Sequence, residues 1–340
     1  MTIKEQVKSL WHLCFDDHEE FIEMYFDHRY NNEVNVTIES GNEVISALQM
    51  LPYPMTFCGK EVPTAYISGA CTHPDYRGRG VMRELLLQSF TRMLKNEVLF
   101  STLIPAEPWL FDYYARNGYA PVFRYTEQPI RVSSLKAKAN SNIMTEQTTE
   151  YEEDAFQYLA NQLTERPCCI QHTSSDFKVV LEDLALTKDA MFVARISKQV
   201  VGVAIAYRDE IHTTVNELVA ENEEVKQELL HQIRKANQSE TMSLRLPVTN
   251  ESEGQVLGMA RIINARKVLD IYAEAHPDVT LDIELTDNRL SSNNGYYYLY
   301  KGKCRTNHEK LPGTHLRLNI AELTEKILAP MHPYMSLMME

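Results

Sequence analysis

The fold of this chain is decided by residues 66–87, which read Tyr-Ile-Ser-Gly-Ala-Cys-Thr-His-Pro-Asp-Tyr-Arg-Gly-Arg-Gly-Val-Met-Arg-Glu-Leu-Leu-Leu. The stretch reads as a β-strand, a sharp glycine turn and the first turns of a helix. Apolar residues after Gly80 recur at positions 81, 82, 85, 86, 90, 93 and 94, which predicts a helix to about Lys95. The first N–H groups of a helix have no intrahelical partner, so this turn is a candidate site for a phosphate.

The details of the turn exclude two common phosphate-binding motifs. A Walker loop needs Gly-Lys followed by Ser or Thr at the helix start, and a dinucleotide fingerprint needs a third glycine where Arg83 stands. Neither pattern is present; instead, Arg77, Gly80 and Met82 follow the strand in a segment, 73–95, with five Lys/Arg and two Asp/Glu. A basic, solvated turn that only caps an amphipathic helix is the alternative interpretation.

Length and composition set further bounds. A chain of 340 residues suits two or three domains, and 44% apolar with 24% charged residues is typical of a soluble globular protein. No apolar run approaches the ~18 residues of a membrane span, and the absence of an apolar run behind the first lysines predicts the cytoplasm. A net charge of −13 disfavours nucleic acid and favours cationic small molecules. The six cysteines form no Cys-x-x-Cys pair and the histidines no metal-binding pattern, so no metal is assigned.

The first ~125 residues predict a compact order of elements. Helices are expected at 3–15 and 17–30, strands at 34–39, 43–51 and 62–72, the helix after Gly80, a strand at 98–104, a helix at 108–117 ended by a left-handed cap at Gly118, and a strand at 119–126. Acids crowd the start of the second helix, where they either cap it or line an entrance for a cationic acceptor: Asp16, Asp17, Glu19, Glu20 and Glu23.

A second unit follows the polar stretch Lys136–Thr149. It repeats the order, with helices at 150–165 and 174–187, strands at 190–197, 199–207 and 211–219, a helix at 222–237 and a strand at 241–247. The equivalent turn, Leu218–Glu224, has no glycine or arginine, and its three carboxylates would repel a pyrophosphate. This copy is therefore predicted to be structural. The last ~85 residues predict an α+β part with an antiparallel sheet: a helix led into by the run from Gly258 to Asp270, strands at 281–285, 296–300 and 315–319, and a helix at 320–329.

The motif Thr72–Gly80 resembles the pyrophosphate-binding motif of the GCN5-related N-acetyltransferases (GNAT superfamily), although Met82 stands where that family usually has Gly or Ala. Together with the run Tyr114-Ala-Arg-Asn-Gly-Tyr119, the degenerate second copy and a tail that opens with Met259-Ala-Arg-Ile-Ile-Asn-Ala, the chain resembles the Eis-like (enhanced intracellular survival) branch. The resemblance implies an α/β (α+β) protein with a GNAT fold around a mixed central sheet. It also implies three domains: a GNAT domain at 1–130, a degenerate GNAT-like domain at 131–250 and a sterol-carrier-like domain at 251–340.

The resemblance further implies an N-acetyltransferase, expected as a homo-oligomer. An acetyl group would pass from acetyl-CoA to an amine of a cationic small molecule or a lysine side chain, by direct attack on the thioester. Acetyl-CoA would be bound by residues of the strand, the turn and the first turn of the helix: Ala70, Cys71, Thr72, Arg77, Gly78, Arg79, Gly80, Val81, Met82 and Arg83.

The resemblance also implies catalytic roles. Tyr114 is the general acid, because a phenol with a pKa of ~10 stays protonated and can donate to a thiolate whose conjugate acid lies near ~8.5. The oxyanion donor is the Cys71 N–H group. The base is the terminal carboxylate, here Glu340, with Glu107 acting through water as a rival. A non-catalytic acetyl-CoA- or lipid-binding regulatory protein is the alternative function.

Overall fold

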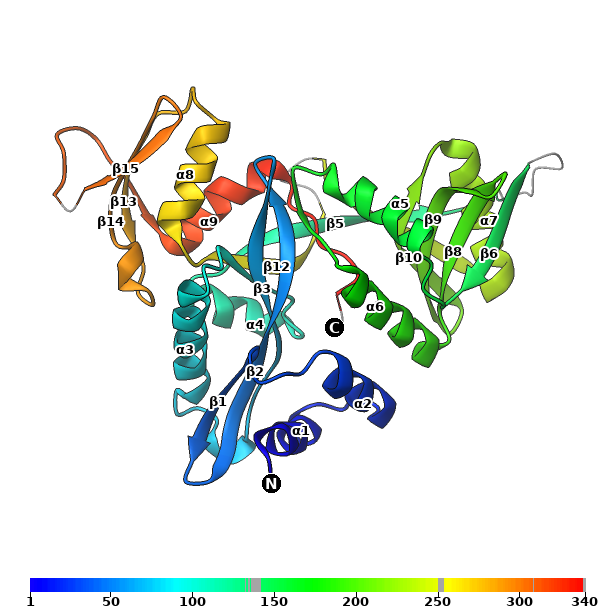
Figure 1. Cartoon of the computed structure of the whole chain (residues 1–340), viewed down its shortest axis with the longest axis horizontal. Helices are drawn as coiled ribbons and strands as arrows, with labels where there is room; N and C mark the ends of the chain where they lie inside the picture. Colours follow the sequence, from blue (N-terminus) through cyan, green and yellow to red (C-terminus); the bar gives the residue numbers. More distant parts are fainter. Residues whose placement is uncertain (132, 134, 136–141, 250–253, 308, 339–340) are drawn as a thin grey trace. The chain divides into compact units, whose positions relative to one another are not determined.

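The computed structural model describes residues 1–131, 133, 135, 142–249, 254–307 and 309–338, and it divides into two compact units (Figure 1). Unit 1 holds Met1–Phe123 and Val256–Pro333, and unit 2 holds Arg124–Gln255 and the described residues from Tyr334 on. Each unit therefore combines segments that are distant in the sequence.

The N-terminal part of unit 1 has the predicted order of elements. It runs α1 (Ile3–Cys14), α2 (Glu19–His28), β1 (Asn35–Ser40), β2 (Glu43–Phe57), β3 (Lys60–Thr72), α3 (Val81–Lys95), β4 (Phe100–Leu103), α4 (Pro108–Ala115) and β5 (Ala120–Ile130), whose first residues lie in this unit. Strands β2 and β3 form a long hairpin because both turn residues, Cys58 and Gly59, take positive φ values of 51° and 73°. Helix α3 lies on one side of this hairpin, and α1 and α2 lie on the other (Figure 1).

The sheet of unit 1 has the order β1-β2-β3-β4-β12. Strand β12 (Gln255–Ile262) corrects an expectation: the run from Gly258 to Asp270 does lead into a helix, α8 (Ala265–Ala275), but its first half is a strand. The strand forms because β4 offers it an antiparallel edge, with Met259 opposite Leu103 and Ile262 opposite Phe100. The paired residues of β12 and β4 are more than 150 positions apart, so the local sequence pattern around Gly258 does not indicate this strand.

The C-terminal part of unit 1 is α+β, as predicted. It contains α8, β13 (Leu281–Thr286), β14 (Gly295–Tyr300), β15 (Lys303–Asn307), β16 (Leu316–Asn319) and α9 (Ile320–Leu328), with the strand order β15-β14-β13-β16. The expected antiparallel sheet is wrong at one edge, where β16 pairs with β13 in parallel. Asn319 and Glu322 form a capping box that begins α9 directly after β16.

Unit 2 has the strand order β5-β11-β10-β9-β8-β6. Its elements are β6 (Ile143–Thr148), α5 (Glu153–Thr164), β7 (Cys168–Ile170), α6 (Ser174–Thr187), β8 (Ala190–Ile196), β9 (Gln199–Asp209), β10 (His212–Ala220), α7 (Glu223–Asn237) and β11 (Thr241–Pro247). The polar stretch expected between the units is partly a strand, since β6 pairs with β8 along its whole length. Residues 136–141 of that stretch lie outside the described residues.

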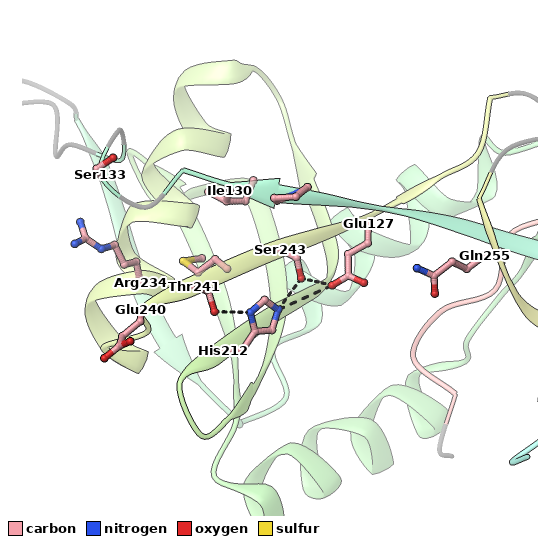
Figure 2. Close-up of a pocket in the computed structure, with 11 residues that line it drawn as sticks. Glu127, Ile130, Ser133, His212, Arg234, Glu240, Thr241, Ser243 and Gln255 are labelled. Atoms are coloured by element: carbon pink, nitrogen blue, oxygen red, sulfur yellow. Dashed lines mark hydrogen bonds and ion pairs between the residues drawn. The ribbon is translucent and has the colours of Figure 1, made fainter.

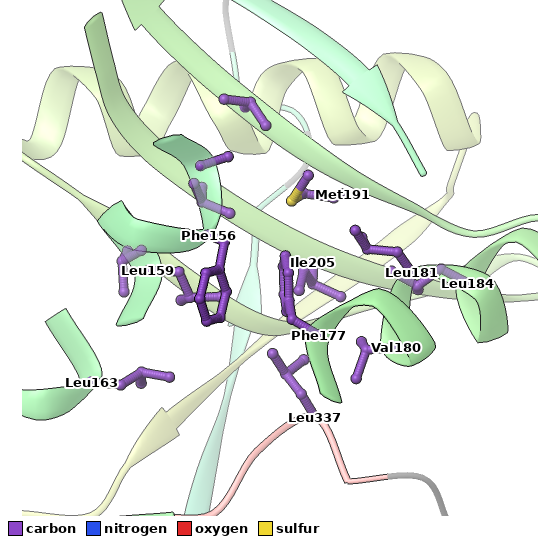
Figure 3. Packing of buried hydrophobic residues seen from close by; sticks show 14 of the residues in the cluster. Phe156, Leu159, Leu163, Phe177, Val180, Leu181, Leu184, Met191, Ile205 and Leu337 are labelled. Atoms are coloured by element: carbon purple, nitrogen blue, oxygen red, sulfur yellow. The ribbon is translucent and has the colours of Figure 1, made fainter. Parts of the chain in front are cut away.

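Helices α5 and α6 cover one face of the unit 2 sheet. Figure 3 shows Phe156 of α5 beside Phe177 of α6, with ring centroids 5.4 Å apart, packed on sheet residues that include Met191 and Ile205. Leu337, near the end of the chain, joins the same cluster. Across the residues that the structure describes, no helix combines the length and apolar character needed to span a membrane.

Candidate functional site

A bulge interrupts strand β3 just before the glycine turn. The pairing with β2 shifts between Ala47, opposite Cys71, and Gln49, opposite Ser68. Gly69 sits in the bulge with φ +58°, and a Cβ there would lie 2.2 Å from Cζ3 of Trp11. Only glycine fits both the backbone angle and the contact, so the buried Trp11 of α1 and Gly69 together fix the bulge.

The other edge of β3 is open over the same residues. Strand β4 pairs with β3 in parallel only from Thr64–Tyr66, opposite Phe100–Thr102, and then ends at Leu103. Among the strands of the described residues, none but β2 and β4 pairs with β3. The predicted donor-binding residues Ala70, Cys71 and Thr72 therefore border a gap in the sheet, where backbone groups are free to bind an extended ligand.

The glycine turn joins this open edge to the start of α3. A short 3₁₀ turn, Pro74–Tyr76, is followed by Gly78 and Gly80 with φ values of 73° and 82°. Gly80 is the N-cap of α3 and provides no side-chain cap, and the first helical bond runs from Glu84 N to Gly80 O at 3.1 Å. The N–H groups at the start of α3 are thus left for an anion.

The remaining residues predicted to bind acetyl-CoA have different surroundings. Arg77 turns back toward the strand, where its Nε donates to Thr72 O at 3.0 Å, so its guanidinium fixes the turn against β3. The Arg79 guanidinium lies over the Tyr76 ring at 5.6 Å. Met82, which replaces a small residue of the resembled motif, is half-buried and packs against the core cluster of unit 1. Its side chain therefore contributes to the packing of α3 on the core.

A pair of thiols adjoins Arg77. The Arg77 Nη2 atom lies 3.6 Å from Sγ of Cys14, and the Cys14 thiol lies 3.5 Å from Thr72 O. A hydrogen bond from the Cys71 thiol, with the help of Arg77, lowers the pKa of Cys14 to about 6, although burial opposes the shift. The same bond raises the pKa of Cys71.

We expect Cys14 to be alkylated by iodoacetamide far faster than Cys58 at pH 7, because the thiolate is the reactive form. Cys58 is the matched control, since it is also half-exposed but burial raises its pKa to about 11. The Cys14 rate should reach half its maximum near pH 6, as measured by peptide mass spectrometry. Equal rates for the two thiols at pH 7 would contradict the assigned surroundings of Cys14.

Tyr114 lies on α4 in the core of the same unit. Its side chain is 7% exposed, and its ring contacts those of Tyr113 and Tyr119 at centroid distances of 5.4 and 5.6 Å. Burial raises the pKa of the Tyr114 phenol, and the neighbouring Tyr113 adds to the shift. The phenol is therefore protonated at neutral pH, as a proton donor must be.

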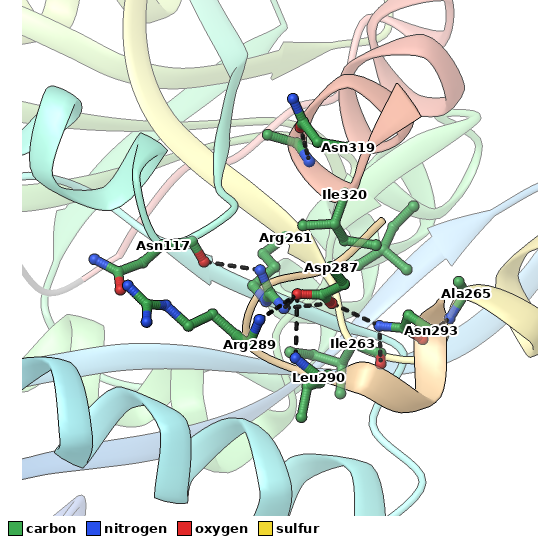
Figure 4. Close-up of polar contacts among 12 residues, drawn as sticks. Asn117, Arg261, Ile263, Ala265, Asp287, Arg289, Leu290, Asn293, Asn319 and Ile320 are labelled. Carbon is green, nitrogen blue, oxygen red and sulfur yellow. Dashed lines mark hydrogen bonds and ion pairs between the residues drawn. The ribbon is translucent and has the colours of Figure 1, made fainter. Parts of the chain in front are cut away.

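A buried ion pair fixes the end of the helix that bears Tyr114 (Figure 4). The guanidinium of Arg261, from β12, makes two bonds of 2.8 and 2.6 Å to the Asp287 carboxylate, and both side chains are fully buried. Its Nη1 donates to Asn117 O at 2.8 Å, and the Asn117 N–H in turn donates to Tyr114 O at 2.8 Å. The C-terminal part of unit 1 thus anchors α4.

The acids at the start of α2 are partly used within unit 1. The Lys8 ammonium pairs with both Glu19 and Glu23, and the Trp11 indole donates to Asp17 at 2.7 Å. These contacts join α2 to α1. Asp16 and Glu20 are exposed. Glu107, the rival base, is the exposed N-cap residue of α4, and Glu340 lies outside the described residues.

The equivalent turn of unit 2 is built differently. The N-cap residue of α7 is Asn222, and its Oδ1 accepts from Val225 N at 3.0 Å, so a side chain occupies the place of an anion. Strand β10 also has a bulge, but the buried Glu217 beside it accepts from the Tyr334 and Ser336 hydroxyls at 2.8 and 2.7 Å. The end of the chain therefore covers this part of unit 2.

Comparison with known families shows which kind of domain contains the glycine turn. Residues 3–122 match the sequence model of a family described as "Acetyltransferase (GNAT) domain". This segment is a GNAT acetyltransferase domain. It spans α1 to the start of β5 and contains the bulged strand, the glycine turn and Tyr114. The chain is accordingly an N-acetyltransferase, and acetyl-CoA is its acyl donor.

Solved structures extend the likeness beyond the GNAT domain. A GCN5-related N-acetyltransferase from Anabaena variabilis has 17% identity and a TM-score of 0.76, with 97% of this chain and 96% of that chain covered. A GCN5-related N-acetyltransferase from Kribbella flavida has 18% identity and a TM-score of 0.74, with 99% of this chain and 95% of that chain covered. Eis1 from Mycobacterium abscessus has 14% identity and a TM-score of 0.71, with 96% of this chain and 87% of that chain covered. At these identities the likeness shows a shared fold. A comparison with curated proteins finds no match.

Two parts of the site escaped the sequence analysis. Arg261 lies within the tail opening, where a lone arginine among apolar residues, Met-Ala-Arg-Ile-Ile, is a sign of a buried and paired charge. Its partner Asp287 lies in a polar turn and has no comparable sign. Cys14 could not be placed beside Cys71 because the two are separated by 57 residues. The described residues contain no group of three or more His, Cys, Asp or Glu side chains that could hold a metal ion.

Proposed function

We propose that this GNAT domain transfers the acetyl group to an amine of a cationic small molecule or a lysine side chain by direct attack on the thioester. The observation that carries the proposal is the open edge of β3 that runs into an uncapped helix N-terminus, within the unit that holds Tyr114. The net charge of −13 supports a cationic acceptor, since the field of the protein raises the local concentration of cations.

In the proposed mechanism the turn and the strand bind the donor. The N–H groups from Gly78 to Arg83 hold the pyrophosphate, and Ala70, Cys71 and Thr72 pair with the pantetheine arm. The neutral amine attacks the thioester carbonyl, and the Cys71 N–H group stabilises the oxyanion. The carbon–sulfur bond then breaks and the departing thiolate takes its proton from Tyr114. The proton lost by the amine goes to the carboxylate of Glu340, or to Glu107 through water.

We also propose that the chain is an Eis-like enzyme. Unit 2 would be a GNAT-like copy without a cofactor, and this is supported by the capped α7 and the occupied β10 bulge. The α+β part after β12 would be the sterol-carrier-like domain, so that the three domains are 1–130, 131–250 and 251–340. We further propose that the protein is a homo-oligomer of the cytoplasm.

An amine panel tests the acceptor class. Release of the free thiol from acetyl-CoA should accelerate with polyamines, aminoglycosides or lysine peptides, and it should stay at the background rate with the corresponding alcohols. If no amine accelerates release while acetyl-CoA still raises the unfolding temperature, the acceptor class proposed here is wrong.

Replacing Tyr114 by phenylalanine is expected to lower kcat by about 100-fold, the typical contribution of a general acid. The affinity for acetyl-CoA should stay within about twofold, because the ring that packs in the core is retained. Steady-state kinetics and acetyl-CoA titration measure the two effects. A parallel loss of both would assign Tyr114 a structural role. Tyr113→Phe, on the neighbouring ring, is the matched control and should leave kcat unchanged.

A further inference from the structure

A pocket of about 810 Å³ lies within unit 2, and all of its lining residues belong to that unit (Figure 2). Its volume is in the range of small-molecule sites, ~300–1,000 Å³. Strand β5 contributes Glu127, Pro129 and Ile130, the start of β10 contributes His212, and β11 contributes Met242 and Ser243. The pocket thus joins an apolar surface to a group of polar side chains.

The polar side chains form one connected network at the centre of the pocket (Figure 2). His212 Nδ1 lies 2.8 Å from Thr241 Oγ1, and His212 Nε2 lies 2.9 Å from Ser243 Oγ. The Ser243 hydroxyl donates to Oε1 of Glu127. Three neighbouring strands hold these groups, since β11 pairs with both β10 and β5.

The available protons decide which group of the network donates and which accepts each hydrogen bond. The single hydroxyl proton of Ser243 goes to Glu127, so Ser243 Oγ accepts from His212, and the proton of the imidazole lies on Nε2. Ser243 is 4% exposed, which makes it a buried bridge and not an accessible nucleophile. Both imidazole nitrogens and one carboxylate oxygen are therefore occupied. The second oxygen of Glu127 is the acceptor that the network leaves for a ligand.

The charges around the pocket select a cation. Glu127 and Glu240 are the acids of the lining, and Arg234 is its permanent cation. Figure 2 shows Arg234 and Glu240 at one end of the pocket, with Glu127 beyond His212. Arg234 and Glu240 bring opposite charges to that end, whereas the Glu127 carboxylate lies at the other end, with Oε1 3.9 Å from His212 Nε2 and held by the Ser243 hydroxyl.

From this geometry we infer that unit 2 binds a small primary amine, with its ammonium group on Glu127 and its alkyl chain against Pro129 and Ile130. An ammonium group has three donors and no acceptor, which suits the free carboxylate oxygen. The Arg234 end disfavours a second ammonium group, so the ligand carries one. In unit 2 the helix N-terminus that would hold a pyrophosphate is capped by Asn222. The amine would therefore be bound with no acetyl-CoA beside it.

Isothermal titration of the full chain with n-butylamine, and with pentanoate as the anion of similar length, tests the inference. Butylamine is expected to bind and pentanoate to give no heat. Glu127→Gln should weaken butylamine binding by at least about tenfold, because it removes the charge but keeps an acceptor for Ser243. Glu165→Gln, an exposed position of unit 2, makes the same charge change and should leave the affinity unchanged.

A second variant guards against misfolding. Ser243→Ala keeps the charge of Glu127 but removes its anchor, and it should weaken binding about threefold. Absence of butylamine binding to the unaltered protein, equal binding of pentanoate, or an affinity unchanged by Glu127→Gln would each overturn the inference. The last result would place the amine elsewhere in the chain. None of these outcomes depends on acetyl transfer, which thiol release measures separately.

Discussion

Replacing Gly118 by alanine is expected to destabilise unit 1 by about 3–5 kcal/mol, the cost of disrupting a buried ion pair. Gly118 has φ +88°, and a Cβ there would lie 1.8 Å from Nη1 of Arg261 and 2.7 Å from Cγ2 of Ile320. Arg261 would have to leave both the Asn117 carbonyl and Asp287 to make room. The left-handed backbone adds about 1 kcal/mol for any residue with a Cβ.

Urea unfolding measures this effect, with Gly41→Ala as the matched control. Gly41 also has a positive φ, +65°, but a Cβ there meets nothing within 4 Å. The control should therefore lose only the backbone contribution, about 1 kcal/mol. If the two variants were equally stable, the packing of Arg261 against Gly118 would be refuted.

The second large effect is expected from Asp287→Ala, at about 3–5 kcal/mol, because it leaves a fully buried guanidinium without its counter-ion. Asp287 also accepts from Leu290 N at 3.1 Å and from Nδ2 of Asn293 at 2.9 Å, so the turn after β13 would loosen as well. Because α4 is tied to this pair through Asn117, acetyl transfer should fall together with stability.

A double replacement separates the charge from the packing. Arg261→Met with Asp287→Ala removes both charges and should be less destabilising than Asp287→Ala alone, since no buried ion is left unpaired. Urea unfolding of the single and double variants forms a double-mutant cycle. Additive losses would mean that Arg261 and Asp287 do not depend on each other.

Acid pH should weaken the same pair. Burial raises the pKa of Asp287, but the Arg261 charge and the hydrogen bonds more than offset this, so the pKa of the folded protein is lowered. A carboxyl with a lowered pKa contributes stability above its unfolded pKa, ~3.9, and the contribution is lost as the pH falls through the folded value. The pair is therefore fully formed at neutral pH.

The sequence was sufficient for features that depend on local backbone chemistry. The glycine turn, the helix after Gly80 and the left-handed Gly118 follow from residue types at fixed positions, and the structure has them all. Strand β12 and the parallel edge between β13 and β16 were not foreseen, because strand partners distant in the sequence decide them.

Contacts between side chains that are distant in the sequence could not be predicted at the site. Nothing in the sequence identified a packing partner for Gly69, whereas the structure places Trp11 against it. Arg77 was grouped with the residues predicted to bind acetyl-CoA, a prediction that stays open, and the sequence did not show that its guanidinium contacts Thr72 and Cys14. Local patterns indicate where a turn is formed, but they carry no information on which distant side chains pack against it.

Hydrogen–deuterium exchange with and without acetyl-CoA tests the central claim most directly, namely that the uncapped turn of unit 1 holds the pyrophosphate and the capped turn of unit 2 does not. Acetyl-CoA should slow exchange of the N–H groups of residues 78–83 and leave residues 221–225 unchanged. Protection of 221–225, or none at 78–83 under saturating acetyl-CoA, would contradict the account.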